Sequence, residues 1–125
     1  MARLTRVLCV HEDRMRLNTR KQILENAGFN VSWTGTGLDG LLQFRVFTPD
    51  IVVLDYELPD ITGDVIARGM KHIKARVPLL MFVPNIFLPA AAIASADAWL
   101  LKGDSPELLL AKIRELLGNK NAMAA

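Results

Sequence analysis

The sequence predicts an α/β domain in which a doubly wound, five-stranded parallel sheet carries helices on both faces. Three observations lead to this fold class. Short runs of branched aliphatic residues, such as Ile51–Leu54, do not alternate with polar residues, which is typical of strands buried on both faces. Longer segments with apolar residues at helical spacing separate these runs. The strand-helix order repeats five times, which favours parallel strands joined by right-handed crossovers.

Each expected strand is an apolar run, and each expected helix is the amphipathic segment that follows one. The strands are expected over residues 7–10, 30–33, 51–54, 79–83 and 98–101. The helices are expected over residues 14–27, about 38–47, 63–73, 90–95 and about 106–117. Pro84 and Pro89 interrupt the segment before the fourth helix, so this helix is predicted to be short or irregular.

Cap and turn residues set the boundaries of these helices. Gly28 follows the first helix, where a residue in the left-handed conformation commonly ends a helix. Thr36 and Thr62 stand before the second and third helices and are expected to cap them. Ser105 is a further capping residue, and the proline after it favours the first turn of the last helix.

Length and composition describe one domain with little net charge. A chain of 125 residues can bury one core, and contents of 51% hydrophobic and 22% charged residues are those of a globular protein. The last helix is expected to end at Gly118, which gives a single domain over residues 1–118 and a frayed tail over 119–125. A net charge of +2 is too small to indicate direct binding of nucleic acid.

Two local features bear on the surroundings of the protein. The basic residues of the first helix, Arg20 among them, are expected to form a solvated face. Cys9 is the single cysteine and lies in a buried strand, which is consistent with a reducing compartment. Without an apolar run of membrane-spanning length or the body of a signal peptide, a cytoplasmic location and no membrane contact are expected.

Charged residues follow three of the predicted strands at the point where each strand ends. His11, Glu12 and Asp13 come after the first, Asp55 after the third, and Lys102 after the fifth. The carboxyl ends of parallel strands meet at one edge, so Glu12, Asp55 and Lys102 are expected to share a solvent-accessible pocket. A capping acid and a lysine that lies along the surface are the alternatives, but the convergence favours a site.

With these residues, the chain resembles a response-regulator receiver domain over about residues 6–118. Asp55 at the end of the third strand, Pro59 and Gly63 after it, and Lys102 after the fifth carry the resemblance. It implies a flavodoxin-like strand order, 2-1-3-4-5. It also implies that Asp55 accepts a phosphoryl group from a histidine kinase or phosphotransfer protein in a two-component phosphorelay. Signalling then passes to a downstream protein target or an output domain, and a homodimer is an open alternative.

The resemblance also assigns a magnesium site to the same strand ends. The ligands it implies are Glu12, Asp55 and the backbone carbonyl of Glu57, and His11 and Asp13 are accessory residues. The lysine that the family uses to contact the phosphoryl group corresponds to Lys102, and an ion pair between Lys102 and Asp55 is expected to hold the site before activation.

The first strand end departs from the family's pattern, because His11–Glu12 stands where the family has two acids. Imidazole is a poor ligand for magnesium, so Mg²⁺ binding is predicted to be weak. His11 could instead donate a hydrogen bond, or be a partly exposed loop residue without a role. A transition-metal site formed by His11, Glu12 and Asp55 is a further, less favoured alternative.

The switch positions also depart from the pattern. Val83 replaces the Ser or Thr hydroxyl that follows the phosphoryl group, and Gly103 replaces a proline. Trp99 matches the family's switching aromatic residue, but it could equally be a core or interface residue. The apolar residues over 86–88 and 90–94 either form a partner surface or pack the short crossover onto the sheet, and packing is slightly favoured.

Three functions are therefore compared. The first is a phosphoacceptor that assists its own phosphorylation on Asp55. The second is a pseudo-receiver that binds a partner without phosphorylation. The third, an enzyme of the aspartyl-phosphate phosphatase type, is ranked last, since 125 residues leave no room for a substrate-capping region.

Overall fold

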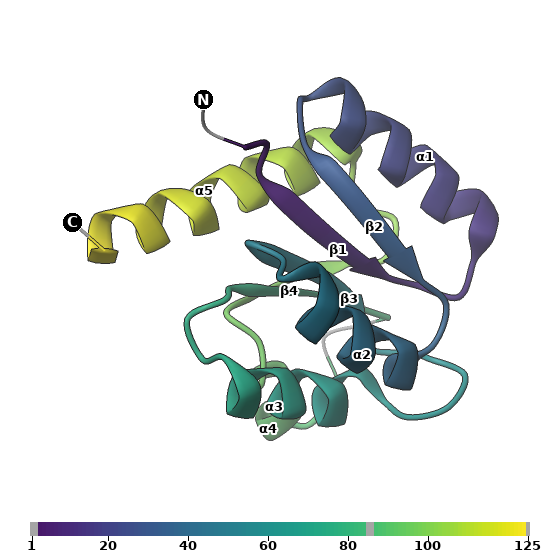
Figure 1. The fold of residues 1–125 in the computed structure, drawn as a ribbon. Coiled ribbons are helices and arrows are strands. Elements are labelled where there is room, and N and C mark those ends of the chain that lie inside the picture. Colours follow the sequence, from purple (N-terminus) through teal and green to yellow (C-terminus); the bar gives the residue numbers. More distant parts are fainter. Residues whose placement is uncertain (1–2, 85–86, 125) are drawn as a thin grey trace.

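The computed structural model describes residues 3–84 and 87–124, and the side chains of all these except 14–17 and 119–124. In these residues five strands alternate with five helices (Figure 1). The elements are β1 (Arg6–Val10), α1 (Arg14–Asn26), β2 (Asn30–Thr34), α2 (Gly37–Phe47), β3 (Ile51–Asp55), α3 (Gly63–Ile73), β4 (Leu79–Val83), α4 (Ala90–Ile93), β5 (Ala98–Leu101) and α5 (Pro106–Ala124).

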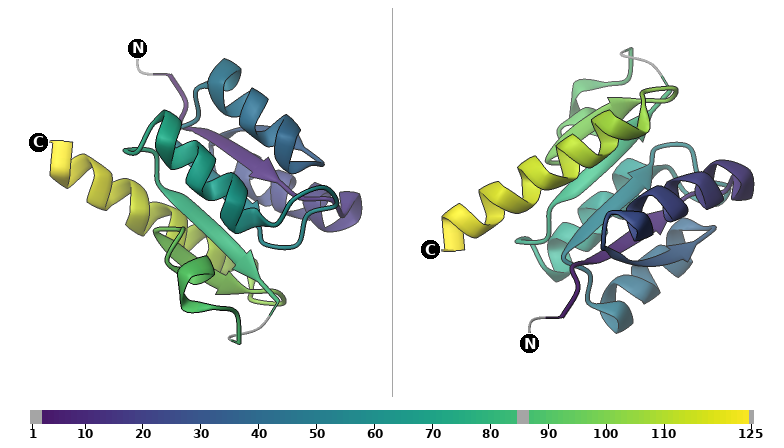
Figure 2. Two further views of the ribbon diagram at one scale, coloured as in Figure 1. Left: turned by 90° about the horizontal axis from the view of Figure 1, so that it is seen from below. Right: turned by 90° about the horizontal axis from the view of Figure 1, so that it is seen from above.

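The predicted fold class and strand order are confirmed. The five strands are parallel and lie in the order β2-β1-β3-β4-β5. Helices α1 and α5 cover one face of the sheet, and α2, α3 and α4 cover the other (Figure 2). No helix in the described part of the chain is both long and apolar enough to cross a bilayer.

The central strand β3 contributes side chains to the hydrophobic clusters on both faces of the sheet. Ile51 and Val53 pack into the cluster that also holds residues of α1 and α5, whereas Val52 and Leu54 pack into the cluster beneath α2 and α3. All five residues of β3 are buried, including Asp55 at its end. Because side chains alternate along a strand, Asp55 belongs to the same face as Ile51 and Val53, which is the α1 face.

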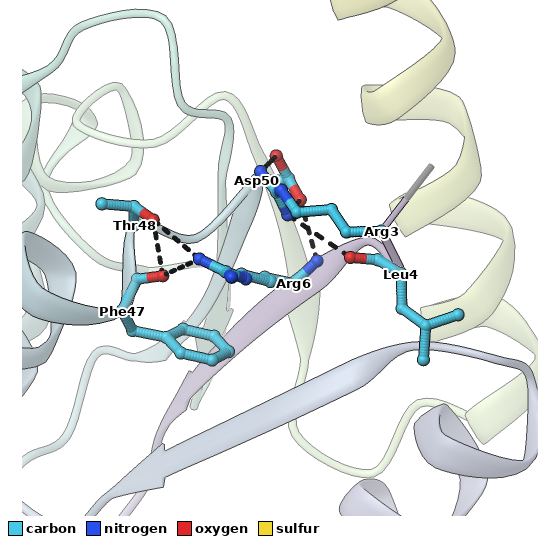
Figure 3. A network of polar contacts seen from close by, with 6 residues as sticks. All are labelled: Arg3, Leu4, Arg6, Phe47, Thr48 and Asp50. Carbon is cyan, nitrogen blue, oxygen red and sulfur yellow. Dashed lines mark hydrogen bonds and ion pairs between the residues drawn. The ribbon is translucent and has the colours of Figure 1, made fainter. Parts of the chain in front are cut away.

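The amino-terminal edge of the sheet is fixed by a polar network (Figure 3). The Asp50 carboxylate accepts two hydrogen bonds from the Arg3 guanidinium, at 2.8 and 3.0 Å, and one from the Arg6 backbone N–H at 2.8 Å. The Arg6 guanidinium donates to the Phe47 carbonyl and the Thr48 hydroxyl, each at 3.0 Å. These contacts tie the start of β1 to the segment before β3, at the edge opposite the strand ends that carry the charged residues.

Asp60 lies in the loop after β3 and caps α2 from a distance. Its two carboxylate oxygens accept the backbone N–H groups of Gly37 and Leu38, at 2.9 and 3.0 Å. Partial burial acts to raise the pKa of Asp60, but the backbone N–H groups of Gly37, Leu38, Asp60 and Ile61 outweigh it and lower the pKa below its ordinary value. The α2 N-terminus thus holds the loop that follows the candidate site.

This cap makes part of the stability dependent on pH. Because the folded pKa is lowered, the carboxylate stabilises the fold fully above its unfolded pKa of about 3.9, and this stabilisation is lost as the pH falls through the folded pKa. We expect Asp60→Asn to lower the free energy of unfolding by about 1 kcal/mol at neutral pH. Urea unfolding of both proteins should show that the difference between their free energies of unfolding becomes smaller at about pH 3. An unchanged difference would contradict the assignment.

Three expectations about boundaries and packing need correction. Thr62 precedes α3, but its hydroxyl makes no cap hydrogen bond and instead interacts with Asp64. The last helix does not end at Gly118, because α5 continues to Ala124 through a segment that is free of proline and contains alanine, a strong helix former. Phe87 does not pack on the sheet, since it is 86% exposed, although Leu88 does. The division of the chain at residue 118 stays a prediction.

Candidate functional site

The carboxyl ends of β1, β3, β4 and β5 lie side by side in the sheet and carry the candidate site. His11 follows β1, Asp55 ends β3, Val83 ends β4 and Lys102 follows β5. Strand pairing fixes this edge, since Lys102 donates its backbone N–H to the Val83 carbonyl at 3.0 Å and Tyr56 donates to Phe82 at 2.9 Å. The strand-end residues predicted from the sequence therefore do meet at one edge of the sheet.

Asp55 is enclosed by two nitrogen-bearing side chains and is only 1% exposed. Its Oδ2 lies 3.0 Å from Nε2 of His11, and its Oδ1 accepts a hydrogen bond from Nη1 of Arg20 at 3.3 Å. A carboxylate without such partners is very costly to bury. The expected open pocket is thus wrong for this arrangement, in which the aspartate is sealed by His11 and Arg20.

His11 is a fixed, buried residue rather than a partly exposed loop histidine. It is 4% exposed, its carbonyl accepts a hydrogen bond from Nε1 of Trp33 at 2.8 Å, and its Nδ1 accepts the backbone N–H of Asp13 at 2.7 Å. Because Nδ1 is an acceptor, a neutral His11 carries its proton on Nε2, the atom that faces Asp55. Among the described residues Nε2 makes no hydrogen bond of acceptable angle, although Asp55 lies within ion-pair distance.

Arg20 reaches the site from α1 and is held there by packing. Its guanidinium carbon lies 3.9 Å from the centre of the Phe82 ring, a cation–π contact, and its side chain is 13% exposed. Phe82 is the register partner of Asp55 in the neighbouring strand. The expectation that the basic residues of the first helix form a solvated face is therefore wrong for Arg20.

Cys9 lies on β1 beneath this cluster and is buried. Burial raises the pKa of its thiol to about 12, an effect that the Arg20 charge opposes and the Asp55 charge reinforces. A thiol with this pKa carries almost no thiolate at neutral pH and is a poor nucleophile. Cys9 is accordingly part of the core, and Asp55 is the nucleophile candidate of this region.

Lys102 does not pair with Asp55 as expected. Its ammonium nitrogen lies 2.8 Å from Oε1 of Glu57, and both of these side chains are partly exposed to solvent. The cation beside Asp55 is Arg20 instead. Lys102 stands next to the site, but its charge is compensated by Glu57 in this arrangement.

The side chains around Asp55 do not fit a magnesium ion in this arrangement. Mg²⁺ requires oxygen ligands in near-octahedral geometry, whereas both Asp55 oxygens face nitrogen atoms and Glu12 is exposed. Within residues 3–84 and 87–124 no group of three or more His, Cys, Asp or Glu side chains is placed to hold a metal. The transition-metal alternative also fails, because His11 Nε2 must lose its proton to bind a metal while Nδ1 already accepts the Asp13 N–H.

The atypical switch positions have distinct surroundings. Val83 is fully buried, and its side chain has no hydroxyl that could face the site. Trp99 is 41% exposed on the edge strand β5, which favours the interface interpretation over the core interpretation. Gly103 has a φ of +96°, a conformation that proline cannot adopt, so the backbone after Lys102 differs from that of a chain with proline there.

Gly63 brings the start of α3 against the phosphoacceptor candidate. Its backbone N–H donates to the Tyr56 carbonyl at 2.7 Å, and a Cβ at this position would lie 2.2 Å from the Asp55 carbonyl oxygen. Any side chain larger than hydrogen therefore displaces the end of β3. The glycine noted in the sequence positions Asp55 through backbone packing.

Arg20 contacts Asp55 but was not among the site residues predicted from the sequence. A signal was available, because an aspartate at the end of a buried strand needs a cation, and the replacement of one acid by His11 weakens the case for a metal ion. The helix after β1 covers this face of the sheet, so its basic residues were the candidates. Their spacing alone does not identify which of them turns inward.

Comparison with known proteins places this chain in a family. The family model of the response regulator receiver domain matches residues 7–114. The chain is 33% identical over 120 residues to the transcriptional regulatory protein CseB of Streptomyces coelicolor, covering 94% of this chain and 51% of that protein. It is 30% identical over 121 residues to the transcriptional regulatory protein TrcR of Mycobacterium tuberculosis, covering 90% and 45% respectively. The chain thus spans about half the length of these curated relatives.

A solved structure agrees in fold over almost the whole chain. A CheY-like response regulator receiver domain protein from Methanospirillum hungatei superposes with a TM-score of 0.90 and 26% identity, covering 97% of this chain and 99% of that one. Its fold matches the observed sheet order and crossovers. The chain therefore belongs to the family of response regulator receiver domains of two-component systems.

Proposed function

We propose that this receiver accepts a phosphoryl group on Asp55 from a histidine kinase or a phosphotransfer protein and signals through protein–protein contacts. The observation that carries the proposal is the surrounding of Asp55: one carboxylate at the carboxyl edge of the sheet, which accepts a hydrogen bond from Arg20 at 3.3 Å and lies 3.0 Å from Nε2 of His11. Groups of this kind bind phosphoryl oxygens as readily as carboxylate oxygens.

The transfer forms one bond and breaks one bond. A carboxylate oxygen of Asp55 attacks phosphorus in line with the leaving group, and the P–N bond of the donor phosphohistidine breaks, so that the imidazole leaves with the electron pair and takes a proton. The product is an acyl phosphate with more negative charge than the carboxylate. Arg20 and the Nε2–H of His11 lie where they stabilise this charge, and Lys102 adds a contact after leaving Glu57.

This receiver binds Mg²⁺ more weakly than is general in the family, whose receivers bind the ion at an acidic pocket. Coordination by Glu12, Asp55 and the Glu57 carbonyl, with His11 and Asp13 as accessory residues, requires the exposed Glu12 to turn toward Asp55. It also requires the two nitrogens to leave the Asp55 oxygens. Both requirements support the prediction of weak binding.

The second candidate is the pseudo-receiver, and the 1% exposure of Asp55 favours it. In that hypothesis Arg20 and His11 permanently neutralise the aspartate, and the domain binds its partner in one state. The fully buried Val83 supports weakened coupling in either case, because it cannot offer a phosphoryl oxygen the hydrogen bond of a hydroxyl. We prefer phosphorylation because the Arg20 side chain is 13% exposed, so solvent reaches the cation that is paired with Asp55.

Partners follow from the family and from the exposed aromatic residues. Receiver domains interact with histidine kinases and output domains and are generally signalling modules rather than enzymes. We propose the exposed Phe87 and Trp99, in the segment from β4 to β5, as the contact with a downstream protein or output domain, or with a second copy in a homodimer. The buried free thiol of Cys9 supports a cytoplasmic location.

Intact mass spectrometry tests phosphorylation directly. After incubation with magnesium and acetyl phosphate, the protein is expected to gain the mass of one phosphoryl group, and Asp55→Asn is expected to abolish this adduct, because the amide is not a nucleophile for phosphorus. A receiver that is known to react serves as the positive control. A parent protein that remains unmodified while the control reacts would favour the pseudo-receiver.

A further inference from the structure

We propose that Arg20 is the built-in cation of this site, so that Asp55 is phosphorylated without a divalent metal ion. This inference rests on the proposed function, since it concerns how Asp55 accepts the phosphoryl group. Arg20 would then be a catalytic residue in the strict sense, because it touches a reacting carboxylate oxygen.

Arg20 already places a positive charge against the Asp55 carboxylate. Its Nη1 lies 3.3 Å from Oδ1 of Asp55 in a site where the carboxylate side chain is 2% exposed. The centre of the Phe82 ring lies 3.9 Å from the guanidinium carbon, and the ring forms a second contact of this cation. A cation with two such contacts is preorganised, and preorganised charge is what stabilises a transition state without reorganisation.

A divalent ion would compete with Arg20 for the Asp55 carboxylate. A magnesium ion bound to Asp55 would share one carboxylate with the guanidinium, and two cations in a poorly solvated site repel each other. The acid that could offset the added charge, Glu12, is exposed, and Glu57 is engaged by Lys102. The local charges of Asp55 and Arg20 already cancel without a metal.

A guanidinium can bind the carboxylate and the phosphoryl group at the same time. It carries five N–H donors in a planar fork, so Nη1 can stay on a carboxylate oxygen while other N–H groups bind phosphoryl oxygens. With acetyl phosphate, the Asp55 oxygen forms its bond to phosphorus as the P–O bond to acetate breaks, and acetate leaves with the electron pair. Arg20 keeps its protons throughout and acts only through charge and hydrogen bonds.

Phosphorylation by acetyl phosphate in EDTA and in magnesium, followed by intact mass, tests the inference. We expect the parent to form its adduct at the same initial rate under both conditions. Arg20→Gln should slow the reaction in EDTA roughly 10- to 100-fold, the value of one hydrogen bond to a charged group. Arg20→Lys should lie between the two, because it keeps the charge and loses the fork. Arg68→Gln, at an arginine that is 54% exposed on α3, is the matched control and should react like the parent.

The outcomes separate this inference from the proposed function. An adduct that forms only with magnesium overturns the role of Arg20 and leaves phosphorylation of Asp55 intact, whereas no adduct under either condition overturns both. Equal rates for the parent, Arg20→Gln and Arg20→Lys also overturn it. Circular dichroism verifies that each variant is folded, and Arg20→Lys keeps the test decisive if Arg20→Gln is not.

A second measurement does not depend on phosphorylation. Trp33 donates its Nε1–H to the His11 carbonyl at 2.8 Å, so its fluorescence reports on displacement of His11. Titration of the parent with magnesium chloride is expected to leave the tryptophan emission unchanged. A saturable change in the parent that is absent from Asp55→Asn would reveal a metal site at Asp55 and contradict the inference.

Discussion

Replacing Gly63 with alanine is expected to lower the free energy of unfolding by about 3 kcal/mol, at the upper end of the usual cost of overpacking. An added Cβ would lie 2.2 Å from the Asp55 carbonyl oxygen and 2.8 Å from the Tyr56 Cα, and both are backbone atoms that cannot rotate away. Relief requires the start of α3 to move from the end of β3. That movement should also disturb Asp55, because the same carbonyl belongs to the candidate phosphoacceptor.

The sign of this effect is what makes it informative. Alanine is a better helix former than glycine by about 1 kcal/mol, so helix propensity alone predicts that the substitution stabilises α3. Gly118→Ala in α5 is the control, since its added Cβ meets no described atom within 4 Å apart from its chain neighbours and the helix's own backbone, and it should be neutral or stabilising. Urea unfolding of the two variants and the parent gives the comparison. A Gly63→Ala protein as stable as the parent would mean that β3 and α3 separate at little cost.

The fold was predictable because its main signals are local. The run Ile51–Leu54 lacks alternation because β3 is buried on both faces, and this burial is itself a consequence of a parallel sheet between two layers of helices. Gly28 was expected in the left-handed conformation and has a φ of +97°. The end of the last helix was not predictable in the same way. One glycine weakens a helix by only about 1 kcal/mol, so Gly118 does not by itself end α5.

The position of the site could be predicted from the sequence, but the ion pairs between its side chains could not. Strand ends converge by topology, which is why Asp55 and His11 could be brought together from the sequence. Pairing depends on side-chain reach. Lys102 could reach a carboxylate at position 55 or at position 57, and it pairs with the more exposed Glu57, where neither charge needs to be stripped of water.

The contacts of Arg20 could not be predicted either, although its position on a helix could. A helical position fixes the direction of a Cα–Cβ bond, but a long side chain can end either in solvent or over the sheet. The Arg20 side chain turns over the sheet because it contacts the Phe82 ring and the charge of Asp55 there. Both residues belong to strands that are distant from Arg20 in the sequence. The identity of the cation in the site therefore depended on tertiary packing.

The pairing of Arg20 with Asp55 leads to the second large effect. Arg20→Met is expected to lower the free energy of unfolding by about 3–5 kcal/mol, because it leaves a buried carboxylate without its cation. The double variant Arg20→Met/Asp55→Asn removes both charges and should recover much of this loss. The coupling energy from the double-mutant cycle should approach the upper part of the range for residues in contact, about 0.5–3 kcal/mol.

An exposed pair in the same chain calibrates the cycle. Lys21 lies 3.7 Å from Glu25 at i,i+4 spacing on α1, and the two side chains are 47% and 49% exposed. Exposed pairs of this kind contribute about 0.3–0.5 kcal/mol. Urea unfolding at neutral pH of both sets of variants measures the two coupling energies under the same conditions. If the Arg20–Asp55 coupling is no larger than that of Lys21–Glu25, then water reaches Asp55 in solution and the sealed arrangement is not the stable one. A larger coupling means that Asp55 is kept from water and that Arg20 holds its charge in solution. Phosphorylation of this receiver would then have to proceed with the guanidinium still bound to Asp55.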